Sequence, residues 1–190
     1  MRSNNGNEEK KRDLDGLLFL SGQVAAEGLC KEIIRLNMEN DVPAIQLIIN
    51  SCGGYCSEGF AIIDIMEWSR IPVYTTGIGM IASMGLLIFM AGEKGKRVIT
   101  PRTSILSHRY SGGAVGNHSS LIAARKEQDL MHQRICNHYF QHTKISTEKE
   151  LNETLLRDVD TWLSPEECIE YGIADTVQKD TKNPYNKSKK

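Results

Sequence analysis

The sequence predicts an α/β fold built on a largely parallel sheet, and two observations support this prediction. Short runs of β-branched and aliphatic residues alternate along the chain with longer segments whose apolar residues recur every three or four positions. Such alternation is typical of parallel strands that are covered by helices. With 190 residues, of which 40% are hydrophobic, the chain is also long enough to bury the core that such a sheet needs.

The first half of the chain supplies three strands, each followed by a helix. The expected strands with their helices are 17–20 with 25–38, 44–50 with 58–68, and 73–76 with 83–91. The second strand is apolar enough to be buried on both faces, as in a parallel sheet. Gly77 and Gly79 are expected to break the third strand, and Gly92 closes the third helix.

The second half begins with two short strands, 97–100 and 104–108, and continues with helices. The longest helix is expected over 117–143, where apolar and small residues recur at three- and four-residue steps and Gln128 interrupts them. This stripe consists of Leu121, Ala124, Met131, Ile135 and Tyr139. Because a domain of this size cannot cover so long a helix, part of it should project and bury its stripe against a partner.

Two capping boxes, Thr147 with Glu150 and Ser164 with Glu167, mark the starts of two further helices. All these elements fall within one predicted domain, residues 14–177. The polar and charged ends of the chain are predicted to be a mobile N-terminal tail and a lysine-rich C-terminal tail, at 1–13 and 178–190.

The composition argues against several classes of partner. A net charge of −1 gives no reason to expect nucleic acid or an anionic membrane surface. The five cysteines are odd in number and scattered, so they do not form a disulfide framework. The N-terminus has no apolar segment that could serve as a signal peptide. Together these features predict a cytoplasmic protein.

The uncharged stretch 71–92 places Ser83 at the start of a buried helix, just after a glycine turn. Free backbone N–H groups and the positive end of the helix dipole point at such a site. A hydroxyl there can attack a carbonyl, and the N–H groups can hold the oxyanion that results. Two plainer interpretations exist: a membrane span of about 20 residues, against which Pro72 and four glycines argue, and a serine that only caps its helix. From this stretch alone, the cap is the favoured interpretation.

A serine nucleophile needs a base and a group that orients the base. His108 is a candidate base because it ends an apolar run and precedes a glycine-rich loop, where catalytic side chains often project. Asp160, just before a capped helix, can orient His108. An α/β-hydrolase elbow is excluded, because position 81 is Ile81 and the chain order is serine, histidine, aspartate. Taken singly, the histidine would be structural and the aspartate a surface turn residue.

Several motifs together make the chain resemble the ClpP family, the proteolytic subunits of the ATP-dependent Clp protease. The resemblance is collinear from about residue 18 to residue 177. The motifs are NSCGG at 50–54, GMIASMG at 79–85, AGEKGKR at 91–97, the pair Ser107-His108, and WLSPEECIEYGIAD at 162–175. The fold that this resemblance implies is a crotonase-like spiral of β-β-α units with a projecting handle helix.

The resemblance also implies roles for individual residues. Ser83 matches the family nucleophile, His108 the base and Asp160 the orienting acid. The backbone N–H groups of Gly54 and Met84 match the oxyanion hole. The implied activity is that of a serine endopeptidase that hydrolyses unfolded polypeptides inside an oligomeric chamber, without a metal or another cofactor.

The implied partners are further copies of this chain, in heptameric rings that stand alone or stack in pairs, and a hexameric AAA+ unfoldase of the Clp type. The chain departs from the family at three places: Cys52 replaces a proline, Arg109-Tyr110 replaces Gln-Pro, and Val159 replaces an arginine that couples ring contact to the triad. With Val159 and the interrupted stripe of helix 117–143, ring stacking is expected to be weaker than usual.

Two other functions remain open at this point. The altered residues around the triad also suit a catalytically silent or accessory ring subunit. A crotonase-type acyl-coenzyme A enzyme would share the fold, but it would leave the coincidence of Ser83, His108 and Asp160 unexplained. His138 and His142, at i and i+4, have a spacing that can bind zinc, but a polar helix face is the plainer interpretation, and no metal is expected.

Overall fold

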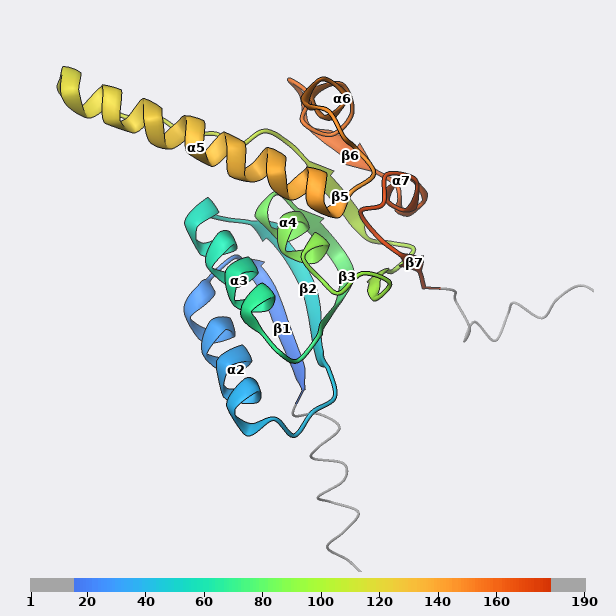
Figure 1. Ribbon diagram of the computed structural model, residues 1–190. Coiled ribbons are helices and arrows are strands. Elements are labelled where there is room, and N and C mark those ends of the chain that lie inside the picture. The colour runs from blue at the N-terminus through green and yellow to red at the C-terminus, as the bar shows by residue number, and fades with distance from the viewer. Residues whose placement is uncertain (1–15, 179–190) are drawn as a thin grey trace, which may run out of the picture.

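The computed structural model describes residues 16–178, so the predictions for the tails lie outside the described residues, Gln178 excepted. One sheet organises this part of the chain (Figure 1). Its strands are β1 (Leu17–Gln23), β2 (Ile45–Gly53), β3 (Val73–Ala82), β4 (Arg97–Ile99), β5 (Ser104–Ser107), β6 (Thr161–Leu163) and β7 (Thr176–Val177). Strands β1-β2-β3-β4-β7 are parallel neighbours, β5 joins β3 in parallel, and β6 runs antiparallel to β5. The predicted largely parallel sheet is confirmed.

The helices of the described chain are α2 (Ala26–Glu39), α3 (Cys56–Trp68), α4 (Met84–Met90), α5 (His118–His142), α6 (Glu148–Thr154) and α7 (Pro165–Glu170). In Figure 1, α2, α3 and α4 lie against the same face of β1, β2 and β3. Buried and exposed or half-buried residues therefore alternate along β2, with Ile45, Leu47 and Ile49 buried and Gln46 exposed. The prediction that this strand is buried on both faces is wrong for the described chain, because the helices cover only one face.

Strand β3 continues through the glycines that were expected to end it. Its pairing with β2 shifts between Gly77 and Ile81, which marks a bulge. Gly79 adopts a positive φ of 59°, and the side-chain oxygen of Asn50 accepts the N–H of Met80 at 3.1 Å. A glycine in a bulge bends a strand without ending it, so β3 reaches Ala82, next to the candidate nucleophile.

Helix α5 has 25 residues, and its N-terminal part extends away from the body of the molecule (Figure 1). The predicted stripe divides accordingly. Ile135 and Tyr139 are buried in the chain's own core and Met131 packs against it, whereas Leu121 is exposed. The prediction of a projecting helix is confirmed, and the stripe is free for a partner only toward its N-terminal end.

The uncharged stretch 71–92 forms β3 and the seven-residue α4 rather than one long helix. Within residues 16–178, no helix combines the length and the apolar character needed to cross a bilayer. The capping box at Ser164 is present in both directions, with the N–H of Ser164 donating to Glu167. At Thr147 the side chain accepts the N–H of Glu150 as predicted.

Candidate active site

Ser83 stands at the junction of β3 and α4 in an unusual backbone conformation. Its φ of 56° and ψ of −126° lie outside the regions that residues with a side chain commonly adopt. Its hydroxyl makes no capping hydrogen bond to α4. The interpretation of Ser83 as a simple helix cap is therefore wrong. Strain of this kind persists only where the surroundings enforce it, and it concentrates at functional sites.

Helix α4 supplies those surroundings, since every one of its residues is buried. The carbonyl of Ser83 accepts the N–H groups of Leu86 and Leu87, which fixes the first turn. The N–H groups of Met84 and Gly85 precede the first intrahelical bond and have no acceptor within the helix. The sequence prediction for Met84 requires an N–H group of this kind at the start of α4.

The end of β2 lies close to the Ser83 side chain. A Cβ added to Gly53 would lie 2.7 Å from the Ser83 Cβ and 3.1 Å from its Oγ. Only glycine fits there, also because Gly53 has a φ of 98°. Gly54 follows directly and packs against Val24. The structure thus brings the turn that contains Gly54 to Ser83.

Ser51 holds this turn, a role that could not be predicted from the sequence. Its hydroxyl donates to the carbonyl of Gly22 at 2.6 Å and accepts the N–H of Gly53 at 3.1 Å. The N–H of Val24 donates to the carbonyl of Gly53 at 2.9 Å. These hydrogen bonds close the turn.

His108 comes to Ser83 through the sheet. Strand β5 lies beside the end of β3, with Ala82 opposite Leu106. The backbone N–H of Ser83 donates to the carbonyl of Leu106 at 3.0 Å. His108 therefore lies two residues after Leu106, whose carbonyl is hydrogen-bonded to the backbone of Ser83.

Asp160 comes to His108 through β6, a strand that the sequence did not predict. Ser107 lies opposite Thr161 in the antiparallel β5–β6 pair, so the next pair along the two chains is His108 with Asp160. The Nδ1 atom of His108 lies 3.6 Å from Oδ1 of Asp160, which is longer than a hydrogen bond. The Asp160 side chain is 59% exposed and that of His108 31%.

The other ring nitrogen of His108, Nε2, is buried and has no hydrogen-bond partner among the described residues. The described geometry therefore contains no hydrogen bond between Ser83 and His108, although their strands are adjacent. Before substrate binds, catalytic hydrogen bonds are often long or incomplete. Of the five residues proposed from the sequence, Met84 begins α4, and the other four lie directly beside a strand end: Gly54 after β2, Ser83 after β3, His108 after β5 and Asp160 before β6.

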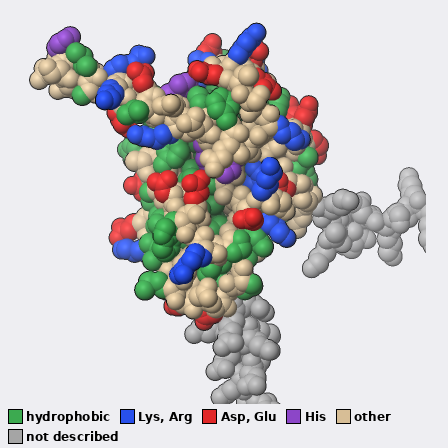
Figure 2. All heavy atoms as spheres, viewed as in Figure 1, with side chains coloured by type: hydrophobic (Ala, Val, Ile, Leu, Met, Phe, Trp, Pro, Cys, Tyr) green, Lys and Arg blue, Asp and Glu red, His purple; other side chains and the backbone are tan. Residues whose placement is uncertain are grey.

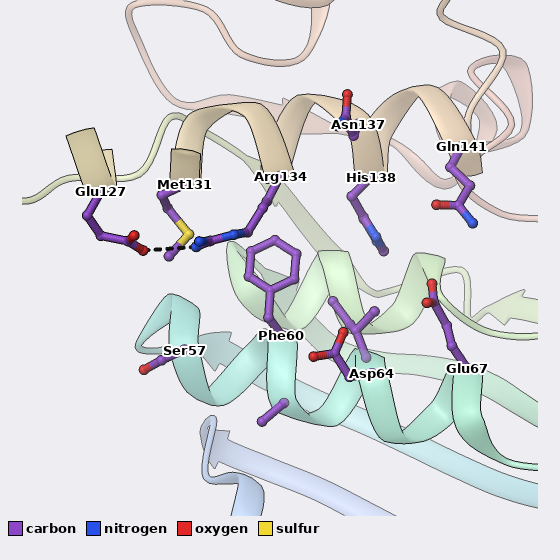
Figure 3. Close-up of a pocket in the computed structure, with 12 residues that line it drawn as sticks. Ser57, Phe60, Asp64, Glu67, Glu127, Met131, Arg134, Asn137, His138 and Gln141 are labelled. Carbon is purple, nitrogen blue, oxygen red and sulfur yellow. Dashed lines mark hydrogen bonds and ion pairs between the residues drawn. The ribbon is translucent and has the colours of Figure 1, made fainter. Parts of the chain in front are cut away.

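A groove lies between α3 and α5, and none of the five candidate residues lines it (Figure 3). His138 lies in it, and its Nε2 donates to the carbonyl of Leu87 in α4 at 2.8 Å. Burial, with a smaller effect of nearby His142, lowers the pKa of His138 to about 3.

The interpretation of this histidine as part of a polar helix face is wrong. It is 5% exposed and ties α5 to the helix that begins after Ser83. Among residues 16–178, no three His, Cys, Asp or Glu side chains lie in an arrangement that could hold a metal ion.

The strained serine, the adjacent helix start and the His–Asp contact define the chain as a candidate serine hydrolase. The model of the Clp protease family matches residues 15–181. An ATP-dependent Clp protease proteolytic subunit of Deinococcus radiodurans is 36% identical over 168 residues, which cover 86% of this chain and 80% of that protein. The ATP-dependent Clp protease proteolytic subunit 2 of Nocardia farcinica is 36% identical over 165 residues, or 85% and 79% of the two chains.

The chain belongs to the Clp protease family, a family of serine endopeptidases. The resemblance that the sequence motifs indicated is thereby confirmed.

Proposed function

We propose that the chain hydrolyses peptide bonds of unfolded polypeptides with Ser83, His108 and Asp160. The state of His108 supports this most directly. One ring nitrogen faces Asp160, and the other is buried without a partner among the described residues. A buried polar atom that is left unpaired in a native structure needs an explanation. Acceptance of the Ser83 proton during catalysis is the explanation that the neighbouring strands favour.

In the proposed reaction, the Ser83 oxygen attacks the carbonyl carbon while its proton passes to Nε2 of His108. The carboxylate of Asp160 stabilises the imidazolium that forms. The N–H groups of Gly54 and Met84 bind the oxyanion of the tetrahedral intermediate. His108 then returns the proton to the leaving amine, the C–N bond breaks, and an acyl group remains on Ser83. Water then attacks the acyl carbon and gives a proton to His108, which passes it to the Ser83 oxygen as the bond between that oxygen and the acyl carbon breaks, so that a carboxylic acid leaves and the serine hydroxyl is restored.

A silent ring subunit is the second candidate, because the distance between His108 and Asp160 exceeds a hydrogen bond and the two sides of the triad are not joined. The family match favours both of these candidates over an acyl-coenzyme A enzyme. A fluorophosphonate separates the two, since it reacts with an activated serine and leaves an inactive one unmodified.

The test is labelling of the purified protein, followed by intact mass measurement and hydrolysis of fluorogenic peptides. We expect one adduct on the parent protein and no adduct on Ser83→Ala, with peptide hydrolysis lower by several orders of magnitude. Ser111→Ala, which removes an exposed hydroxyl from the loop after His108, serves as the matched control and should label like the parent. A parent protein that stays unlabelled would favour the silent subunit. A Ser83→Ala protein that keeps its activity would remove Ser83 from the mechanism.

The proposal includes assembly into heptameric rings, single or stacked, that are fed by a Clp-type AAA+ unfoldase. The relatives bear names that describe subunits of an ATP-dependent protease. The projecting part of α5 exposes Leu121 and Ile122, and apolar surface is visible there in Figure 2. Apolar side chains on a projecting helix indicate a contact with another chain. The five cysteines are free, which supports a reducing compartment such as the cytoplasm.

Light scattering after size exclusion tests this assembly. Leu121→Asp with Ile122→Asp should separate stacked rings, because charge would be buried at the contact. Ser119→Asp, an exposed position one turn earlier, is the control. A double ring that withstood both substitutions would show that this end of α5 does not carry the contact. A chain that stayed monomeric in every buffer would contradict the chamber.

A further inference from the structure

Arg109, the residue directly after His108, is bound entirely by the segment that leads to Asp160. Its Nε donates to the carbonyl of Leu156 at 2.7 Å. Its Nη1 lies 2.7 Å from Oδ1 of Asp158, and its Nη2 lies 3.4 Å from Oδ1 of Asn152. One guanidinium group thus joins the end of β5 to the end of α6 and to the turn before β6.

Two neighbours of Arg109 are fixed as well. The hydroxyl of Ser107 donates to the carbonyl of Leu155 at 2.7 Å, so the Tyr139 hydroxyl, also 2.7 Å away, donates to Ser107. Tyr110 donates from its hydroxyl to the carbonyl of Gln128 in α5 at 2.8 Å. The residues on either side of His108 are therefore anchored on other elements. The contact between His108 and Asp160 depends on these anchors, because the two side chains are not themselves hydrogen-bonded.

The bond from Arg109 to Leu156 is the anchor that acts on the acid. Asp160 follows Leu156 by four residues, and the strand pairing of β6 begins only at Thr161. Between these points the chain has no ladder to hold it. The Leu156 side chain is buried in the core, so the carbonyl that accepts the hydrogen bond from Arg109 belongs to a residue that is held in place.

We infer that Arg109 is a positioning residue that sets the distance between His108 and Asp160 from within one chain. This inference rests on the proposed function. A guanidinium is planar and presents its donors in a rigid fork, so it fixes direction as well as distance, which an ammonium cannot do. Because small displacements of catalytic groups can cost about 100-fold in rate, the turn has to be held closely.

We attribute the positioning of this turn to the hydrogen bond from Arg109 to the Leu156 carbonyl rather than to the ion pair between Arg109 and Asp158. The Asp158 side chain is 89% exposed, and exposed ion pairs contribute little and are screened by salt. Loss of the Asp158 charge should therefore matter less than loss of the guanidinium fork.

Arg109→Lys tests the inference because it keeps the positive charge and removes the fork. We expect kcat to fall about 10- to 100-fold with KM nearly unchanged, because the inference gives Arg109 a role in the geometry of the His108–Asp160 pair and none in peptide binding. Asp158→Asn should cost less than Arg109→Lys, and methylguanidinium should restore part of the activity of Arg109→Ala.

Arg102→Lys, at an exposed arginine in the turn between β4 and β5, is the matched control and should behave like the parent. Melting temperatures of all variants separate positioning from loss of the fold. Arg109→Lys with parental kcat would overturn the inference, as would Asp158→Asn with the larger loss of kcat. A parent protein that is not labelled by a fluorophosphonate would instead overturn the proposed function, so the two failures are distinguishable.

Discussion

Ser83 precedes a helix whose residues are all buried, whereas His108 and Asp160 lie at the rim of the molecule in reach of solvent. We call the region around Ser83, the proposed nucleophile, the nucleophile side, and the region around His108, the proposed base, the base side. On the nucleophile side, apolar packing against β2, β3 and α3 holds α4 and thereby enforces the strained backbone of Ser83. On the base side, polar bonds from Ser107 and Arg109 hold the turn before β6. Substitutions on the nucleophile side should therefore change both stability and activity, whereas substitutions on the base side should change mainly activity.

The largest expected effect lies on the base side. Asp160→Asn removes the charge that stabilises the imidazolium and favours the wrong tautomer of His108. We expect kcat to fall by about 10³ to 10⁴. Because the Asp160 side chain is 59% exposed, the melting temperature should hardly change. Asp41→Asn, an exposed carboxylate far from the site in sequence, is the control. A marked fall in the melting temperature of Asp160→Asn, together with the loss of kcat, would contradict the division into two sides.

A smaller effect that combines stability and activity is expected on the nucleophile side. A Cβ added to Gly59 in α3 would lie 2.1 Å from Cε of Met84 and 3.1 Å from its Cβ. Gly59→Ala should therefore lower the free energy of unfolding by about 1 to 3 kcal/mol through overpacking. It should also reduce kcat, because Met84 carries one of the proposed oxyanion donors.

Gly28→Ala is the matched control, since Gly28 also lies in a helix and an added Cβ there meets no atom within 4 Å. This change should stabilise the protein by up to about 1 kcal/mol and leave kcat alone. Chemical denaturation and peptide hydrolysis measure both variants. A Gly59→Ala protein that lost stability without any loss of kcat would mean that the packing of α4 does not set the geometry of the site.

The two sides also differ in how far the sequence predicted them. On the nucleophile side, the local pattern of an uncharged strand followed by an apolar helix predicts that Ser83 begins the helix, although this stretch alone favours a helix cap and its glycines do not end the strand. On the base side, His108 and Asp160 were paired only by their chemistry and by family resemblance. The strand that aligns them, β6, has three residues, which is too short for a periodic pattern to reveal.

Long-range hydrogen bonds could not be predicted from the sequence for a related reason. Ser51 and Ser107 bind carbonyl groups 29 and 48 positions away, and no local pattern announces such partners. The burial of β2 was overestimated because a run of aliphatic residues states only that a strand is apolar, not which of its faces a helix covers. Register, long-range bonds and layer order arise from the folded chain as a whole.

The last expected effect is absent at neutral pH and concerns acid conditions on the nucleophile side, where His138 donates to Leu87 of α4. Its pKa is about 3 in the folded chain, against about 6.5 for an unfolded histidine. Because the unfolded chain takes up the proton first, stability from this site is fully present above about pH 6.5 and is lost as the pH falls toward 3. At pH 5 the loss should be about 2 kcal/mol relative to pH 7.

His138→Gln keeps an N–H donor for the Leu87 carbonyl but cannot take up a proton in this range. Its free energy of unfolding should therefore fall less than that of the parent between pH 7 and pH 5, by about 2 kcal/mol. His118→Gln, at an exposed position at the start of α5, should follow the parent. Denaturant titrations at both pH values measure the difference. Parallel pH dependence in the parent and His138→Gln would show that this histidine is not the acid-sensitive support of α4, and the packing beneath Ser83 would then be independent of pH.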